Sequence, residues 1–86
     1  MNPFSLNISS SDGSLFKGDA VKISLRGADG DLAVMAGHIP FITSVKPCEF
    51  HFELDDETVR YGRTDGGILT VSGDEVVFLT GNVTWL

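Results

Sequence analysis

The fold is decided by residues 30–43, which read GDLAVMAGHIPFIT. Here a short apolar run is followed by glycine, histidine and an X-Pro bond, and a second apolar run begins directly afterwards. Gly37 takes positive φ without a Cβ clash, whereas Pro40 fixes its own φ and disfavours helix for the residue before it. The stretch therefore predicts a strand that ends at Ala36, a tight turn, and a second strand from Phe41, with the histidine at the tip of a rigid corner.

Alternation of apolar and polar residues on both sides of this corner predicts further short strands. The expected strands cover residues 4–8, 15–18, 21–25, 32–35, 41–45, 48–54, 59–61, 68–71, 76–79 and 83–86. Asp55-Asp56 is expected to form a two-residue turn, and no segment has the period of an amphipathic helix. The sequence therefore predicts one all-β domain over residues 1–86, an antiparallel β-sandwich (flattened barrel) of about eight to ten short strands without C-terminal helices.

The same pattern assigns side chains to the faces of these strands. Three sets each share one face: Phe4, Leu6 and Ile8; Val21, Ile23 and Leu25; and Cys48, Phe50, Phe52 and Leu54. Residues 32–35 are apolar throughout, which is typical of a strand buried on both faces or lying near another subunit. Val59 and Tyr61 are expected to face the core. Arg60 and Arg63 then point away.

Composition narrows the class of protein. Eighty-six residues with 42% hydrophobic and 21% charged side chains are typical of one globular domain. Six basic against 12 acidic residues give a net charge of −6, which disfavours binding to nucleic acid or to anionic lipid. No window reaches the roughly 20 apolar residues of a membrane span, and no leader opens the chain. Because Cys48 is the single cysteine, we expect a soluble domain in a reducing, cytoplasmic space.

A catalytic or metal-binding role for His38 would need partner residues at a suitable spacing. The other histidine is His51 and the one thiol is Cys48, and none of the three lies at a spacing typical of metal ligands. We therefore interpret His38 as a contact residue. Asp29 and Asp31 are interpreted as solvated carboxylates of a turn rather than as a general acid-base pair.

The remaining polar residues indicate no catalytic site. The acidic cluster of Glu53, Asp55, Asp56 and Glu57 is typical of a charged hairpin tip, since a calcium site would need a longer oxygen-rich loop. Cys48 is interpreted as a small buried hydrophobe. Ser10 has no base at a recognisable spacing, and the glycine-rich turns lack the strand-loop-helix context of a phosphate site. We therefore predict no catalytic residue, no metal site and no cofactor.

Some apolar residues are not needed by such a core. They are Met35 beside the corner, Leu15 and Phe16 near an edge, and Trp85 and Leu86 at the end of the sequence. Exposed apolar surface on a small acidic domain usually marks a protein partner. The residues alone thus predict a β-sandwich interaction module.

Several motifs follow the order of one known family. They are Phe4-Ser5-Leu6-Asn7-Ile8, Phe16-Lys17-Gly18, the Gly-His-x-Pro corner with its later Thr43 and Lys46-Pro47, Asp65-Gly66-Gly67-Ile68-Leu69-Thr70-Val71, and Val76-Val77-Phe78-Leu79. In these motifs, and over essentially the whole chain, the sequence resembles the N-terminal β-sandwich of the ε subunit of F-type ATP synthases.

The resemblance implies a mechanical role in the rotating central stalk. A domain of this family couples the γ subunit to the polar loops of the c-ring, so that ATP synthesis stays linked to ion translocation. It is not itself catalytic, has no nucleotide site and does not insert into the membrane. The implied location is the F1 sector, peripheral to the cytoplasmic face of a bacterial cell membrane.

The resemblance also implies contact residues. Asp31, Gly37 and His38 match positions at the end of the sandwich that meets the c-ring, and Ser10, Leu15 and Thr43 match positions that face γ. Because Thr43 and His38 are close in sequence, the two surfaces are expected to share the corner.

Departures from the family pattern are small within the domain. Ala33 and Ala36 stand where glycine and proline are frequent, and Cys48 stands where glycine usually follows Lys-Pro. The sequence ends at Leu86, whereas most members continue into a helical hairpin that can restrain ATP hydrolysis. We therefore expect a short form without the inhibitory hairpin or the ATP site that some hairpins carry. The alternative is a free-standing β-sandwich that binds a protein or a ligand.

Overall fold

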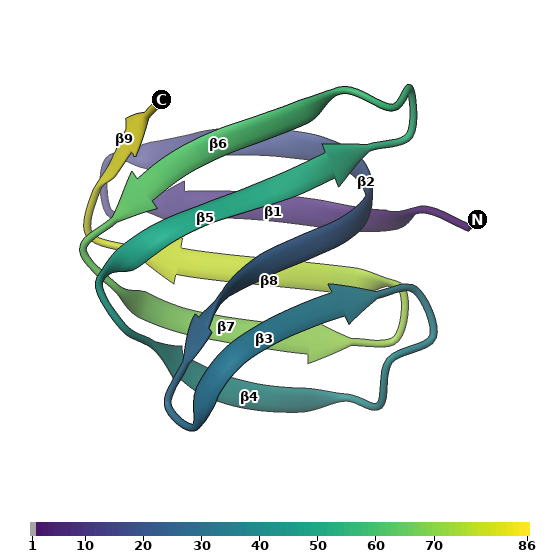
Figure 1. Ribbon diagram of the computed structural model, residues 1–86, viewed down its shortest axis with the longest axis horizontal. Coiled ribbons are helices and arrows are strands. Elements are labelled where there is room, and N and C mark those ends of the chain that lie inside the picture. The colour runs from purple at the N-terminus through teal and green to yellow at the C-terminus, as the bar shows by residue number, and fades with distance from the viewer. Residues whose placement is uncertain (1) are drawn as a thin grey trace.

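The computed structural model describes residues 2–86 and contains nine β-strands (Figure 1). The strands are β1 (Phe4–Ser10), β2 (Gly13–Gly27), β3 (Gly30–Met35), β4 (Phe41–Val45), β5 (Cys48–Leu54), β6 (Val59–Thr64), β7 (Gly67–Ser72), β8 (Glu75–Thr80) and β9 (Val83–Trp85). The all-β prediction is confirmed, and the number of strands falls within the expected range. The described part of the chain holds no helix with the length and apolarity to cross a bilayer.

The strands form two layers that share the long strand β2 (Figure 1). One layer contains β1, β8, β7 and β4, and the other contains β3, β5, β6 and β9. The first part of β2 pairs with β1, and its second part pairs with β5 and β3. At its end, Gly27 of β2 also meets Val45 of β4. A single bent strand thus holds the two layers of the sandwich together.

The bend in β2 corrects the sequence prediction of two separate strands there. Pairing with β5 shifts register between Ala20 and Lys22, so one residue is accommodated as a bulge. Ala20 is fully buried, whereas Val21, which was expected to share a face with Ile23, is half-buried. A bulge bends a strand and re-aims its side chains. It therefore carries the chain from one layer into the other without a turn.

The direction in which neighbouring strands run is the second difference between the structure and the sequence prediction. The pair β1–β8 is parallel, with Leu6 beside Val76 and Ile8 beside Phe78, whereas the other strand pairs are antiparallel. Alternation reports which face of a strand is buried and not which way its neighbour runs. The sequence pattern therefore could not predict that β1 and β8 pair in parallel.

Most residues assigned to the core lie there. The buried hydrophobic residues are Phe4, Leu6, Ile8, Ala20, Ile23, Leu25, Val34, Val45, Phe50, Phe52, Leu69, Val71, Val76 and Phe78. Leu15, Phe16 and Trp85, which were expected as surplus apolar surface, pack against this cluster instead. Phe50 and Phe78 meet edge to face, with ring centroids 5.8 Å apart. An aromatic centre thus spans the two layers.

The inward face of β6 is the reverse of the prediction at residues 59–61, whereas Arg63 points outward as predicted. Tyr61 is 54% exposed and Val59 also points outward, whereas Gly62 and Thr64 are buried and Arg60 is half-buried. A Cβ at Gly62 would lie 2.9 Å from the Phe50 ring, so the inner position beside that ring admits glycine only. The glycine sets the face of the strand.

Two hairpin turns test the turn predictions. Gly73 has a φ of +59° in the tight turn that joins β7 to β8. Between β5 and β6 the loop is longer than the expected Asp55-Asp56 turn. Leu54 N–H donates to the Thr58 carbonyl at 2.7 Å, and Glu57 takes a φ of +71°. The extra residues reverse the chain where no glycine is available.

Candidate functional site

The corner predicted from residues 36–40 is present and joins β3 to β4. Gly37 has a φ of +84°, and His38 N–H donates to the Met35 carbonyl at 3.3 Å. The exposed His38 ring lies 4.9 Å from the Phe41 ring, and its Nδ1 is 2.9 Å from the Ile39 carbonyl oxygen. These contacts fix the direction of the imidazole on the surface.

Asp31 lies at the opposite end of β3 from this corner. Its carboxylate is 85% exposed and pairs with Arg26 at 3.2 Å between Nε and Oδ1. At about 3.3 Å per strand residue, the rest of β3 holds Asp31 more than roughly 10 Å from Gly37 and His38. Most of the strand β3 thus lies between Asp31 and the corner, and the expectation that all three residues contact the c-ring stays a prediction.

Thr43 lies near Asp31, since both line one groove. It belongs to the inward side of β4, and its hydroxyl donates to the Ser44 carbonyl at 3.1 Å. A groove of about 260 Å³ brings Thr43 and Asp31 together. The groove is lined by Gly27, Ala28, Asp29, Gly30, Asp31, Leu32, Phe41, Ile42 and Thr43.

Ser10 and Leu15 lie together at the β1–β2 hairpin, far along the sheet from Thr43. Ser10 Oγ accepts a hydrogen bond from Asp12 N–H at 3.2 Å and so helps to close the turn. Pairing shifts between Ile8 and Ser9, and Leu15 is the extra residue on β2 at that point. Both residues are half-buried, but Leu15 packs against the core, so a substitution at Ser10 disturbs the core less.

The outer surface of the layer β1–β8–β7–β4 was not predicted as a site. Its outward side chains include Glu75 at one end and, beyond it, a set here called the uncharged face: Asn7, Ser9, Ile42, Ser44, Ile68, Thr70, Val77 and Leu79. Ile42 is 70% exposed, Ile68 44% and Leu79 51%. Ile68 pairs directly with Leu79 and with Ser44. An apolar patch without charge on a chain of net charge −6 is surface that favours a protein partner.

A signal for this face was present in the sequence. Residues 68–69 and 76–79 are apolar at consecutive positions, so each strand carries apolar side chains on both faces. Such continuous runs indicate a strand covered on both sides. In the domain alone the inward side chains are covered, and Ile68 and Leu79 are not.

The other layer has a different character. Its outward side chains, here called the charged face, include Lys22, Arg26, Asp31, Glu49, Glu53 and Arg63. Arg63 pairs with Glu49 at 3.2 Å, and the rings of His51 and Tyr61 lie 5.6 Å apart on neighbouring strands. The two outer surfaces therefore suit partners of different chemistry.

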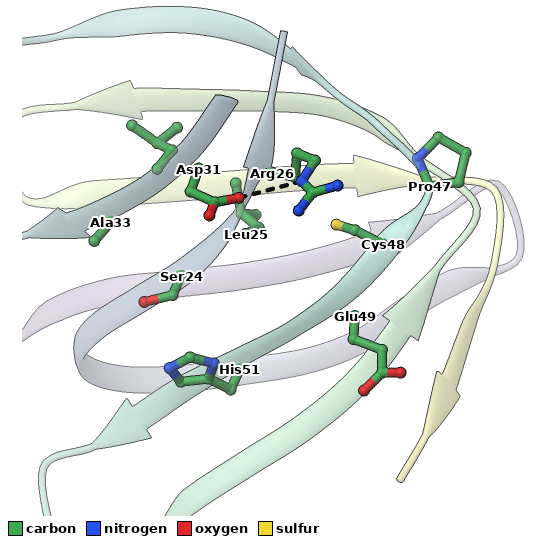
Figure 2. A pocket seen from close by; sticks show the side chains of 10 residues that line it. Ser24, Leu25, Arg26, Asp31, Ala33, Pro47, Cys48, Glu49 and His51 are labelled. Carbon is green, nitrogen blue, oxygen red and sulfur yellow. Dashed lines mark hydrogen bonds and ion pairs between the residues drawn. The ribbon is translucent and has the colours of Figure 1, made fainter. Parts of the chain in front are cut away.

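A hollow of about 540 Å³ opens on the charged face where β5 diverges from β2 (Figure 2). Figure 2 shows Cys48 and His51 on β5 across from Ser24 and the Arg26–Asp31 pair. Cys48 is free and half-buried, not fully buried as interpreted from the sequence, and it packs against the core from the start of β5. Among residues 2–86 no group of three His, Cys, Asp or Glu side chains is arranged to hold a metal ion.

Comparison with known proteins identifies the family. The family model described as "ATP synthase, Delta/Epsilon chain, beta-sandwich domain" matches residues 3–86. The chain belongs to this family. The ATP synthase epsilon chain 2 of Photobacterium profundum is 38% identical over 81 residues, which are 91% of this chain and 54% of that protein. The sodium-ion-specific ATP synthase epsilon chain of Acetobacterium woodii is 33% identical over 82 residues, 95% of this chain and 62% of that protein.

Solved structures with the delta/epsilon fold agree in shape. A chain of the Euglena gracilis mitochondrial ATP synthase (OSCP, F1 and c-ring) matches with a TM-score of 0.90 at 19% identity, over 96% of this chain and 53% of that chain. A chain of the Tetrahymena thermophila mitochondrial ATP synthase (central stalk and c-ring) matches with a TM-score of 0.78 at 9% identity, over 93% and 64%. At such identities the likeness shows the fold alone. The delta/epsilon domain described here spans little more than half the length of these relatives.

Proposed function

We propose that this domain is a non-catalytic rotor subunit of the central stalk of an F-type ATP synthase, which couples the γ subunit to the c-ring during ATP synthesis. It works in the F1 sector, peripheral to the cytoplasmic face of a bacterial cell membrane. Family membership supports this role, and so does the fact that the chains of similar structure belong to ATP synthase complexes. The uncharged face is the observation that carries it, because a strut that transmits torque needs a wide, well-packed contact with the shaft.

The γ subunit is the partner proposed for the uncharged face. Ile42, Ile68 and Leu79 stand on three adjacent strands, so together they form one patch. Burying them against another apolar surface would contribute roughly 25 cal/mol for each Å² removed from water. Ser10, at the hairpin on one side of this layer, remains a proposed γ contact, as do Leu15 and Thr43.

The c-ring is the partner proposed for the ends of β3. Asp31 is an exposed acid at one end, and Gly37 and His38 form the corner at the other. Since β3 separates them, the two sets would meet different parts of the rotor. The c-ring contact proposed for Asp31 therefore needs a test of its own, separate from a test of the contact proposed for His38.

Co-purification with the γ subunit encoded beside this chain, followed by isothermal titration calorimetry, tests the proposal. Ile68→Asp puts a charge into the centre of the uncharged face and is expected to weaken γ binding by at least about tenfold. Tyr61→Asp is the matched control, because Tyr61 is a similarly exposed strand residue on the charged face. Equal losses in both variants would contradict the assignment of the face.

ATP hydrolysis by the reconstituted catalytic complex, with and without this chain, tests the coupling role. Stoichiometric γ binding with little change in hydrolysis is the expected result for this β-sandwich domain, which is proposed to couple and not to catalyse. If the domain does not bind γ at all, the alternative of a free-standing β-sandwich binding module replaces the rotor proposal.

A further inference from the structure

The strand β3 has one paired edge and one free edge. It pairs with β2 from Met35, opposite Lys22, to Gly30, opposite Gly27. Within residues 2–86 no strand pairs with its other edge. A free edge presents backbone N–H and C=O groups in the spacing that another strand would use. The question is which groups of β3 remain available.

Alternation of the ladder identifies them. The Leu54–Thr58 hydrogen bond sets the β5–β6 pairing, so the backbone groups of Glu53 and His51 point away from β6 and toward Lys22 and Ser24 of β2. The intervening residues of β2, among them Ile23 and Leu25, must then bond to β3 through their partners Val34 and Leu32. By the same alternation Asp31, Ala33 and Met35 direct their backbone groups to the free edge.

One of these groups is already occupied. The Met35 carbonyl accepts a hydrogen bond from His38 N–H, which closes the edge at the corner. The N–H and C=O of Asp31 and of Ala33, and the N–H of Met35, form the remaining row. These donors and acceptors belong to Asp31, Ala33 and Met35, which are every second residue of β3. Together they are enough to bind a short extended segment.

Apart from the exposed charge of Asp31, this edge lacks the devices that usually block edge pairing. Natural edge strands are protected by charged side chains, above all lysine, by proline, by a bulge or by a very short length. β3 has six residues, a regular register with β2, and neither lysine nor proline. Ala33 is exposed and small, so the backbone of a second strand could approach without a steric barrier.

The surroundings of the edge define the chemistry of an occupant. The groove of about 260 Å³ between β3 and β4 includes Leu32, Phe41 and Thr43 and could receive an apolar side chain. Two exposed acids, Asp29 and Asp31, stand at one end of the same groove. Arg26 offsets one of these charges only. With a net charge of −6, the chain favours a basic occupant over a second copy of itself.

We propose that β3 accepts an extended, basic segment of a partner protein as an added antiparallel or parallel strand. The segment hydrogen-bonds to Asp31 and Ala33, places an apolar side chain in the groove and a cationic one near Asp29 and Asp31. This mode of recognition takes affinity from the backbone and specificity from alternate side chains. The proposal does not depend on the γ contact, which uses the uncharged face of the other layer.

Amide hydrogen exchange measured by NMR on the labelled domain tests the proposal. The probe is an acetylated octapeptide of alternating lysine and valine, and the charge control alternates glutamate and valine. At saturating basic peptide, exchange at the Asp31 and Ala33 amides should slow by at least about tenfold. The Leu32 and Val34 amides, which already bond to β2, should change little. The acidic peptide should protect none of them.

Two substitutions at one position separate the backbone contact from a packing effect. Ala33→Pro removes the outward N–H and should abolish the protection, whereas Ala33→Val keeps the N–H and should retain it. The amide spectrum of each variant shows whether the sandwich is intact. Asp31→Lys should lower the affinity for the basic peptide.

Three results would overturn the proposal. The first is the absence of protection at Asp31 and Ala33 under saturating basic peptide. The second is undiminished binding by a folded Ala33→Pro variant. The third is a dimer of the unliganded domain in sedimentation experiments that Ala33→Pro abolishes, since the edge would then belong to a second copy. None of these results alters the test of γ binding, so the two proposals fail independently.

Discussion

The Arg60 guanidinium carbon lies 4.4 Å from the centroid of the Trp85 ring and joins β6 to β9. The same guanidinium is 5.6 Å from the Phe16 ring centroid, on the long strand β2. A cation over aromatic faces is attracted by their negative electrostatic potential, and the Arg60 stem buries apolar surface as well. One side chain that sequence alternation assigned to solvent thus connects three strands.

Arg60→Ala is expected to lower the free energy of unfolding by about 1–2 kcal/mol, because both the cation–π contact and the packing of the stem are lost. Urea unfolding followed by Trp85 fluorescence measures it. Arg63→Ala is the control, since Arg63 makes an exposed ion pair with Glu49 that is worth at most about 1 kcal/mol. A smaller loss from Arg60→Ala than from Arg63→Ala would contradict the role of the contact.

Thr80→Val is expected to destabilise the domain by about 1–3 kcal/mol, because it removes the hydroxyl from a closed hydrogen-bond chain. Gly66 N–H donates to Thr64 Oγ1 at 3.0 Å, Thr64 and Thr80 hydroxyls lie 2.6 Å apart, and Thr80 Oγ1 donates to the Gly66 carbonyl at 2.7 Å. Both threonines are buried, so no water replaces the lost partner. Thermal unfolding by circular dichroism measures the loss.

Two variants control for size and for β-propensity. Thr80→Ser keeps the hydroxyl and should retain most of the stability, whereas Thr84→Val on the exposed side of β9 should change it by no more than about 0.5 kcal/mol. If Thr80→Val behaved like Thr84→Val, the network would contribute nothing to stability.

Gly67→Ala should prevent normal pairing of β7 with β8. A Cβ at Gly67 would overlap the Leu79 carbonyl oxygen and lie 2.9 Å from the Thr80 Cα, and both obstacles are backbone atoms that cannot rotate away. We expect a loss of more than about 3 kcal/mol, seen as a collapsed urea midpoint or as insoluble expression. Gly73→Asn is the control, because Gly73 has open space at its Cβ and a left-handed φ that asparagine tolerates. It should cost about 1 kcal/mol or less.

Local order explains what the sequence could predict. The corner at Gly37 and Pro40 follows from the backbone preferences of those two residues, and the inward faces of β1 and β5 follow from strict alternation. Such features depend on neighbours in sequence. They were predicted correctly for that reason.

Non-local contacts explain the rest. The face of β6 is set by the Phe50 ring against Gly62, which is 12 residues away, and residue type alone favoured the opposite face. The neighbourhood of Thr43 and Asp31 arises because β4 meets β2 at Gly27, which no local pattern encodes. The uncharged face needed the order of strands across the layer before its three exposed apolar side chains could be placed together.

Ser10→Arg is expected to weaken γ binding by about tenfold if the γ contact reaches the β1–β2 hairpin. Ser10 is the better position for this test than Leu15, because Leu15 packs against the core and a charge there would also destabilise the fold. Calorimetry gives the affinity, and the unfolding midpoint shows that the domain is intact. Asp55→Asn, at the tip of the β5–β6 hairpin, raises the net charge by the same one unit and is the control. Unchanged affinity in Ser10→Arg would restrict the γ contact to the centre of the uncharged face.

The Asp56 carboxyl has a pKa lowered from its ordinary value of 3.8, chiefly by a hydrogen bond from the Thr58 hydroxyl and next by the Thr58 N–H, which lies 3.0 Å from Oδ1. Because the folded pKa is below the unfolded one, this group contributes stability that is present above the unfolded pKa and is lost as pH falls through the folded pKa.

Thr58→Val removes the hydroxyl but keeps the N–H. The Asp56 pKa should then rise toward 3.8, and the acid-side loss of stability should become shallower. Carboxyl carbon NMR titration measures the pKa directly, with the Asp55 carboxyl of the same loop as the internal control. An Asp56 pKa that stays where it was in Thr58→Val would show that the backbone N–H alone holds it down.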